Sequence, residues 1–192
     1  MLGLPDQNGK KGDMLKASLE LFATRGFDAV SVRDIAKAAG ISEAALYKHF
    51  AGKEDMALFI FGGIISEYTA RLTAIADRPA GAVTKLGSIV DVTYDLYREY
   101  PAEIRFALLS QYLFWDKVAE EIKPHFVIRR ILADGMDRGE IPRRGVYLWI
   151  AVFSGVVLQP LAQYRYFADV LPELENLKAE IKALVQKMFA AE

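Results

Sequence analysis

The side chains with the clearest chemistry lie close together between Ser42 and Lys53, in the sequence SEAALYKHFAGK. Tyr47, Lys48 and His49 can each donate a hydrogen bond, and the small alanines before them would let a large ligand approach closely. Hydroxyl and ammonium groups are common donors to DNA phosphates, and a lysine can also donate to the edge of guanine. The segment therefore indicates contact with a nucleic acid.

Composition excludes several other kinds of site. The 192 residues include no cysteine, which excludes disulfides, thiolate catalysis and cysteine-based metal sites. The two histidines, His49 and His125, are far apart in sequence, so a histidine-rich metal cluster is excluded as well. The chain also lacks the sequence motifs of a nucleophile elbow and of a phosphate-binding loop. We therefore expect no metal, no cofactor and no enzymatic activity.

The overall charge is nearly balanced. Apolar residue types make up 53% of the chain and charged types 26%, which excludes a disordered chain and allows a large core. Net charge is −1, with +2 over residues 1–53 and −3 over the remainder. These values argue against a protein that coats nucleic acid through bulk charge, but they are compatible with a local basic face.

The most apolar run is Gly145–Leu158, GVYLWIAVFSGVVL. It is shorter than the roughly 20 residues that cross a bilayer, and Gln159 and Pro160 follow it, so we expect a buried or interfacial helix. The polar N-terminal sequence is unlike a secretory signal, which predicts a cytoplasmic protein.

Three short helices are expected to position the side chains that contact nucleic acid. The first covers about Asp13–Arg25, with Asp13 as a plausible N-cap. Ser31 opens the second in the sequence S-x-x-D, a variant of the capping box, and Gly40 ends it. Ser42 caps the third, in which Leu46 and Phe50 face inward. Two short helices around a tight turn predict a helix-turn-helix, whose second helix can lie in the major groove.

The rest of the chain is predicted to be helical too, giving an all-α protein of about nine helices. The expected helices cover residues 53–76, 82–100, 102–116, 124–138, 146–168 and 173–190. Residues 117–123 could be helix or loop, and a strand is conceivable for 146–158, although the length of that segment favours helix.

Residues 22–53, FATRGFDAVSVRDIAKAAGISEAALYKHFAGK, resemble the DNA-binding region of the TetR family of transcriptional regulators. The matching motifs are F-x-x-x-G-[FY], [ST]-[VT]-x-x-I-A-x-x-A-G-[VI]-S and L-Y-x-[HY]-F-x-x-K, and the resemblance covers about residues 15–56. It implies a helix-turn-helix DNA-binding domain over residues 1–53 and a helical effector-binding and dimerisation domain over residues 54–192.

The resemblance also implies roles for individual residues. Tyr47, His49, Lys53 and Ser31 match positions at which the family contacts the DNA backbone or caps the second helix. The positions expected to read bases are Glu43, Ala44, Ala45 and Lys48. Together the predicted DNA-binding residues are Ser31, Arg33, Ser42, Glu43, Ala44, Ala45, Tyr47, Lys48, His49 and Lys53.

The central helices are dense in aromatic residues with a few polar groups among them, as ligand pockets often are, although most of these aromatics are expected to be ordinary core. This lining predicts a small hydrophobic or aromatic effector. The predicted effector-binding residues are Tyr94, Phe106, Ser110, Gln111, Phe114, Trp115 and Trp149.

The last helix has an apolar seam of the coiled-coil kind. Its members, spaced alternately by three and four residues, are Leu174, Leu177, Ile181, Leu184 and Met188. Val185 and Phe189 widen the seam, which predicts two packing partners. With the apolar helix 146–168, it is expected to form half of an intermolecular four-helix bundle in a homodimer.

These features predict a dimeric repressor that binds a palindromic operator in double-stranded DNA and is released from it by the effector. A nucleoid or cell-division factor of the same fold is the alternative.

Overall fold

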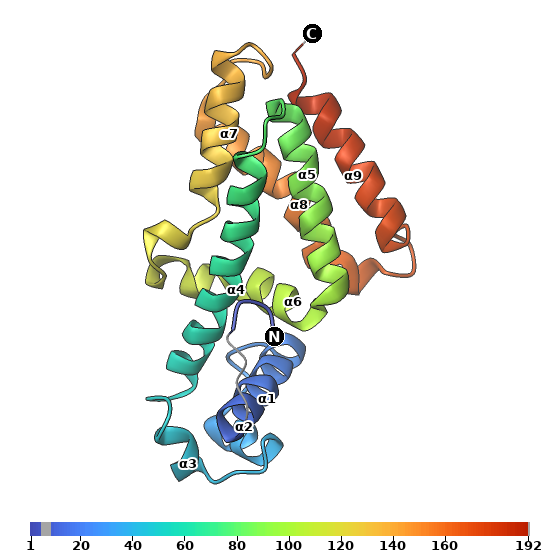
Figure 1. Ribbon diagram of the computed structural model, residues 1–192. Coiled ribbons are helices and arrows are strands. Elements are labelled where there is room, and N and C mark those ends of the chain that lie inside the picture. Colours follow the sequence, from blue (N-terminus) through green and yellow to red (C-terminus); the bar gives the residue numbers. More distant parts are fainter. Residues whose placement is uncertain (5–8, 192) are drawn as a thin grey trace. The chain divides into compact units, whose positions relative to one another are not determined.

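The computed structural model of the chain describes residues 1–4 and 9–191. Within these residues it contains nine α-helices, two short 3-10 helices and no strand, which confirms the all-α prediction (Figure 1). The α-helices are α1 (Lys10–Arg25), α2 (Val32–Ala38), α3 (Glu43–Tyr47), α4 (Lys53–Ala76), α5 (Ala82–Glu99), α6 (Pro101–Phe114), α7 (His125–Asp137), α8 (Val146–Phe167) and α9 (Leu174–Phe189). The 3-10 helices are η1 (Trp115–Lys117), which continues from the end of α6, and η2 (Glu120–Ile122), which lies within residues 117–123, for which helix and loop were both open.

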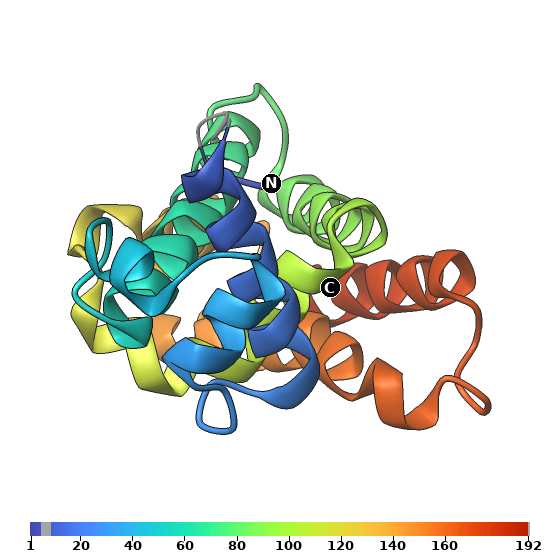
Figure 2. The same cartoon turned by 90° about the horizontal axis from the view of Figure 1, so that it is seen from below.

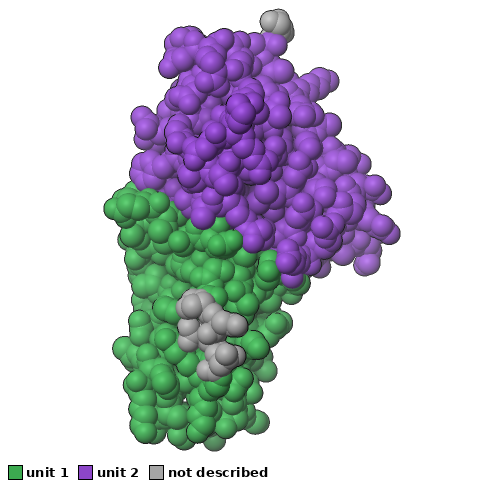
Figure 3. Space-filling view, in the orientation of Figure 1, with its two compact units in different colours: residues 1–67, 100–122 green, residues 68–99, 123–192 purple. Residues whose placement is uncertain are grey.

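Packing divides the chain into two compact units, which Figure 3 shows in different colours. Unit 1 comprises Met1–Glu67 and Tyr100–Ile122, and unit 2 comprises Tyr68–Glu99 and Lys123–Glu192. The division is not a single cut in the sequence, because α6 returns to pack with α1. The functional boundary predicted after residue 53 stays a prediction.

Two helix starts differ from the sequence prediction for local reasons. Helix α1 begins at Lys10, one turn earlier than expected, because Gly9 has a φ of +79° and its carbonyl accepts from the Asp13 N–H. Asp13 therefore lies in the first turn and is not the N-cap. Helix α6 begins with Pro101 itself, since the first turn of a helix does not need the N–H that proline lacks.

The core of unit 1 is an aromatic cluster in which α1, α4, α6 and the loop after α1 meet. The ring of Phe22 stacks on that of Phe106 with centroids 5.6 Å apart, and Phe27 meets Phe114 edge-on at 5.3 Å. Phe61 lies 5.7 Å from Phe114. Helix α1 contacts both α6 and α2, and Figure 2 shows α1 and α2 crossing this unit as seen from below. This aromatic cluster is the core of the unit that holds α2 and α3 in position.

The paired glycines of α4 have unequal surroundings. A Cβ on Gly63 would lie 2.7 Å from Leu4 Cδ2 and 2.8 Å from the Gly3 carbonyl oxygen, because residues 1–4 pack against α4 at this point. A Cβ on Gly62 would meet nothing within 4 Å. Close packing therefore explains Gly63, whereas nothing in the structure explains Gly62.

Unit 2 is a helical bundle in which α5 contacts α7, α8 and α9 (Figure 1). The inner side of α9 is formed by Leu177, Ile181, Val185 and Phe189, all of which are buried. Two ion pairs fasten its flank to α5, since Lys182 Nζ lies 2.6 Å from a carboxylate oxygen of Asp91 and Lys178 Nζ lies 3.0 Å from one of Asp95. The predicted seam is thus split, because Leu177 and Ile181 face their own unit while Leu184 and Met188 are exposed.

The first turn of α5 is capped from the α7–α8 connection. Glu140 accepts a hydrogen bond from the Ala82 N–H and another, at 2.6 Å, from Arg138 Nε. The Arg138 guanidinium and, next, the Ala82 N–H hold the pKa of the Glu140 carboxyl below its ordinary value. Gly139 makes the turn between them with a φ of +74°. The charged turn at residues 138–140 therefore has a structural role.

Helix α8 continues through Pro160 to Phe167, so the apolar helix is longer than the apolar run that marks it in the sequence. By length and composition alone, α4 and α8 are each long and apolar enough to cross a membrane, although core helices of soluble proteins pass the same test. Of the most apolar window of α8, 17% is buried within the chain. The burial expected for this helix is therefore absent over much of its surface.

Candidate DNA-binding interface

The start of α2 has the capping box that the sequence predicts. Ser31 Oγ accepts from the Asp34 N–H at 3.1 Å, and the Asp34 carboxylate accepts from the Ser31 N–H at 2.9 Å. The Ser31 hydroxyl, then its N–H, lower the pKa of the Asp34 carboxyl. Both partners are exposed at the helix start, so two of its N–H groups are satisfied within the chain.

The turn between α2 and α3 is set by Gly40. Its φ of +66° is a left-handed conformation that glycine adopts easily. The Gly40 N–H donates to the Lys37 carbonyl and the Ile41 N–H donates to the Ala36 carbonyl at 3.0 Å, which is the Schellman pattern of a helix end. Ser42 then accepts from the Ala45 N–H at 3.2 Å and opens α3. The predicted helix-turn-helix is therefore present.

Helix α3 has one buried face and one exposed face, as its sequence predicts. Leu46 is fully buried and Phe50, just beyond its end, is 5% exposed, so both face the core. Tyr47 is 55% exposed. The other exposed residues of this stretch are Ser42, Glu43, Ala44, Lys48 and His49, with Ala45 half-buried, and Ser31 and Arg33 are exposed on α2. Apart from Lys53, the predicted DNA-binding residues thus form an outward surface around α2 and α3, which lie side by side in Figure 1.

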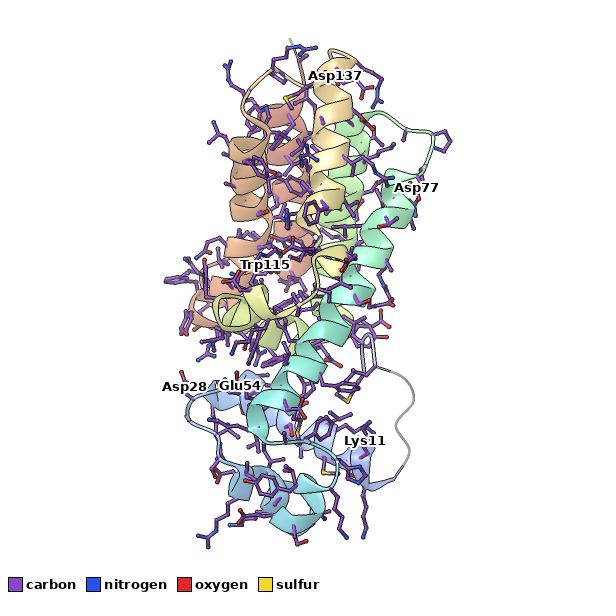
Figure 4. All side chains as sticks on the ribbon, turned by 90° about the vertical axis from the view of Figure 1, so that its left-hand side faces the viewer. Lys11, Asp28, Glu54, Asp77, Trp115 and Asp137 are labelled. Atoms are coloured by element: carbon purple, nitrogen blue, oxygen red, sulfur yellow. The ribbon has the colours of Figure 1, made fainter. Side chains whose placement is uncertain are left out.

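Lys53, predicted to contact phosphate, has a different environment. Its ammonium donates to the carbonyl oxygens of Val30 at 2.9 Å, Phe27 at 3.1 Å and Asp28 at 3.4 Å, and it lies 4.4 Å from the centre of the Phe27 ring. Figure 4 shows Asp28 of this loop close to Glu54, which follows Lys53 at the start of α4. All three ammonium protons are therefore directed at the α1–α2 loop.

The N-terminus of α4 has its own carboxylates. Glu54 and Asp55 lie in its first turn, and Asp55 accepts from the Ala51 N–H at 2.9 Å. Glu54 is also paired with Lys117 from η1. These negative charges offset the positive end of the helix dipole. The predicted phosphate contact of Lys53 at this helix start stays a prediction.

The predicted effector-binding residues are divided between the two units. Phe106 and Phe114 belong to the aromatic cluster of unit 1, where Ser110 is buried beside them on α6, and Gln111 and Trp115 are half-buried in the same unit. Their role in effector binding stays a prediction.

The other two predicted effector-binding residues, Tyr94 and Trp149, lie in unit 2. Trp149 donates its indole N–H to the Pro142 carbonyl at 2.9 Å and packs on Phe189 at 4.6 Å, so it anchors the start of α8. Tyr94 on α5 is 1% exposed, and its hydroxyl has no hydrogen-bond partner among the described residues.

Comparison with known proteins supports this interface. Residues 14–59 match the family described as "Bacterial regulatory proteins, tetR family". The transcriptional repressor KstR2 of Mycobacterium tuberculosis is 33% identical over 97 residues, which cover 50% of this chain and 48% of KstR2. The chain thus spans about half the length of this curated relative. The relatives are named as transcription regulators and not as enzymes, in agreement with the sequence prediction.

Solved structures extend the similarity to the whole fold. The ketosteroid transcriptional regulator KstR2 of M. tuberculosis aligns with a TM-score of 0.75 and 23% identity, covering 100% of this chain and 99% of that one. The regulator FadR from Bacillus subtilis in complex with stearoyl-CoA aligns with a TM-score of 0.78 and 21% identity, covering 93% of this chain and 99% of that one. At these identities the likeness shows the fold alone, and it confirms the predicted TetR-type architecture.

Proposed function

We propose that this chain, whose residues 14–59 are a TetR-family DNA-binding region, is a dimeric transcriptional repressor that a hydrophobic effector releases from its operator. The observation that carries the proposal is the capped helix-turn-helix with Leu46 and Phe50 turned inward and Tyr47, Lys48 and His49 turned outward. The major groove admits one helix, and the exposed donors are of the kinds that bind phosphates and base edges.

Two helix starts support the anchoring of DNA in different ways. At α2, the exposed guanidinium of Arg33 lies one residue beyond the helix start, and it can donate hydrogen bonds to a phosphate. At α4, Lys53 supports the same surface indirectly by fixing the loop that leads into α2. Tyr47 and Arg33 are therefore better candidates for direct phosphate contact than Lys53.

A homodimer is supported by the surface of unit 2. On α9, Leu184 is 49% exposed and Met188 is 39% exposed, although both are apolar. On α8, exposed Leu148, Ala151 and Gly155 follow one another at helical spacing, and the small residues would let a second helix approach closely. A second copy of α8 and α9 would cover these apolar side chains. Twofold symmetry would then present two α3 helices to a palindromic operator.

The proposed effector is a hydrophobic compound. The similar structures include a ketosteroid transcriptional regulator and a FadR regulator in complex with stearoyl-CoA, and the buried side chains of unit 2 are mostly apolar. We infer that this chain responds to a steroid-like or fatty acyl compound. The sequence predicted a hydrophobic or aromatic effector, and of these two an aromatic effector has less support than an aliphatic one.

The test is selection of bound fragments from genomic DNA, followed by release of the best fragment with a panel of metabolites that includes acyl-CoA thioesters and steroids. The proposal expects a palindromic site, binding by a dimer and release by a hydrophobic member of the panel. Tight, sequence-specific binding that no metabolite relieves would instead favour a nucleoid or cell-division factor. A matched variant, Tyr47→Ala, should weaken binding while leaving the fold intact, because Tyr47 is exposed.

A further inference from the structure

One buried hydroxyl in unit 2 lacks a partner. Tyr94 is 1% exposed, and its hydroxyl oxygen is buried without a hydrogen bond among the described residues. The residue before it behaves differently, since Thr93 donates to the Ile89 carbonyl at 2.7 Å and its hydroxyl lies 2.8 Å from that of Tyr68. The hydroxyl of Thr93 therefore has hydrogen-bond partners within the bundle, whereas the hydroxyl of its neighbour Tyr94 has none among the described residues.

An unsatisfied hydroxyl at a buried position is unfavourable to folding, because it loses its hydrogen bonds to water and gains none. A phenylalanine at position 94 would fill nearly the same volume without that loss. The hydroxyl of Tyr94 is therefore best explained by a partner that the chain does not supply. Burial raises the pKa of Tyr94 far above its ordinary value, so the group remains protonated and can donate.

The charges nearest along α5 are already paired. Asp91 binds Lys182 and Asp95 binds Lys178, so these carboxylates are engaged with α9. Of the basic side chains of α5, Lys85 donates to the Ala76 carbonyl and Arg98 pairs with Glu175.

The buried neighbours of Tyr94 along α5 are mainly apolar, among them Ile89, Val90 and Leu96. A charged ligand group at Tyr94 would lose its hydration with no free countercharge on this helix, whereas a neutral carbonyl would lose much less.

We propose that the Tyr94 hydroxyl donates a hydrogen bond to a neutral carbonyl oxygen, a thioester or ketone, of the hydrophobic effector. This inference rests on the proposed effector response and narrows it, since it selects carbonyl compounds over hydrocarbons and over free carboxylates. Because Tyr94 is 1% exposed, the effector reaches the hydroxyl only when the surrounding side chains move apart. Tyr94 is then a specificity residue in the interior of unit 2.

The test compares the full chain with its Tyr94→Phe variant on two pairs of probes. Stearoyl-CoA is paired with S-octadecyl-CoA, a thioether that lacks the carbonyl oxygen, and androst-4-ene-3,17-dione is paired with the hydrocarbon androstane. For at least one pair the unchanged chain should bind the carbonyl compound about tenfold more tightly, the effect of one hydrogen bond of about 1.4 kcal/mol. The variant should bind both members of that pair equally. Stearic acid should bind either protein more weakly than the thioester.

A second readout is thermal unfolding without a ligand. Tyr94→Phe should be at least as stable as the unchanged chain, because the substitution removes an unsatisfied hydroxyl. Trp149→Phe is the matched control, and it should be less stable because the indole N–H has a partner at 2.9 Å.

Three results would overturn the inference. A clear fall in the melting temperature of Tyr94→Phe would mean that the hydroxyl already has a partner such as a buried water. If both proteins preferred the carbonyl compound equally, the Tyr94 hydroxyl would not be the group that recognises the carbonyl oxygen. Failure of the unchanged chain to bind either carbonyl probe would exclude the proposed ligand class. The repressor proposal would survive each of these results, because its own test is specific operator binding by a dimer and release by any hydrophobic metabolite of the panel.

Discussion

Lys53 offers the sharpest test of how the interface is built, and the change to make is Lys53→Met. Methionine keeps most of the length and apolar character of the side chain but loses the ammonium, which donates at 2.9 Å to Val30 and at 3.1 Å to Phe27. A hydrogen bond from a charged group contributes about 1.5–3 kcal/mol when buried, and partial exposure reduces this to about 1 kcal/mol each. The two short bonds therefore predict a loss of about 2 kcal/mol in the free energy of unfolding.

The assay combines thermal unfolding with a salt titration of operator binding. For a chain of this size the loss corresponds to a fall of about 4–8 °C in melting temperature. The slope of log affinity against log salt should stay unchanged, because the ammonium is committed to the loop and neutralises no phosphate. Lys48→Met is the matched control, since Lys48 is exposed on the outward surface. That variant should unfold like the unchanged chain but bind DNA with a shallower slope or an altered base preference.

The opposite pattern would refute the structural reasoning. If Lys53→Met kept its melting temperature and lowered the slope by about 0.9 per half-site, Lys53 would be a phosphate anchor, as the resemblance implies. Affinity that falls together with stability at constant slope would identify it as a residue that positions the start of α2.

Three further predictions concern packing, assembly and pH. Gly63→Ala should lower the melting temperature, because overpacking reduces the free energy of unfolding by about 1–3 kcal/mol. Gly62→Ala should raise the melting temperature, because the higher helix propensity of alanine adds up to about 1 kcal/mol to the free energy of unfolding. Equal effects of the two substitutions would contradict the packing account. The double substitution Leu184→Glu with Met188→Glu should leave the fold intact but give a monomer in sedimentation, and persisting dimers would place the interface elsewhere. Because the pKa of Glu140 is lowered in the folded protein, its carboxylate stabilises the fold fully at pH values above its unfolded-state pKa. This stabilisation is lost as the pH falls through the pKa of the folded state. Glu140→Gln should therefore reduce the fall in the free energy of unfolding that is measured at acid pH.

The local design of the DNA-binding surface could be predicted from the sequence because its signals are short in range. The capping box joins Ser31 to Asp34, three positions further along the chain, and the left-handed turn at Gly40 depends on one residue type. The inward placement of Leu46 follows from helical spacing, and Phe50, just beyond the helix end, keeps the same side because its N–H donates to the Leu46 carbonyl. Each of these features is determined by neighbours within about one helical turn, so tertiary packing did not alter them.

Other features depended on segments that are distant in sequence, and only the tertiary structure decided them. Lys53 reaches carbonyls 23–26 residues before it, and no local pattern indicates that its ammonium is occupied. Phe106 lies in unit 1 because α6 packs on α1, and no local pattern in the sequence indicates that its ring stacks on that of Phe22. The residues of the predicted α9 seam all satisfy the same spacing, but the contact with α5 buries Leu177 and leaves Leu184 exposed. Periodicity tells which residues share a helix face, and only the packing of other helices decides whether that face is covered by the same chain.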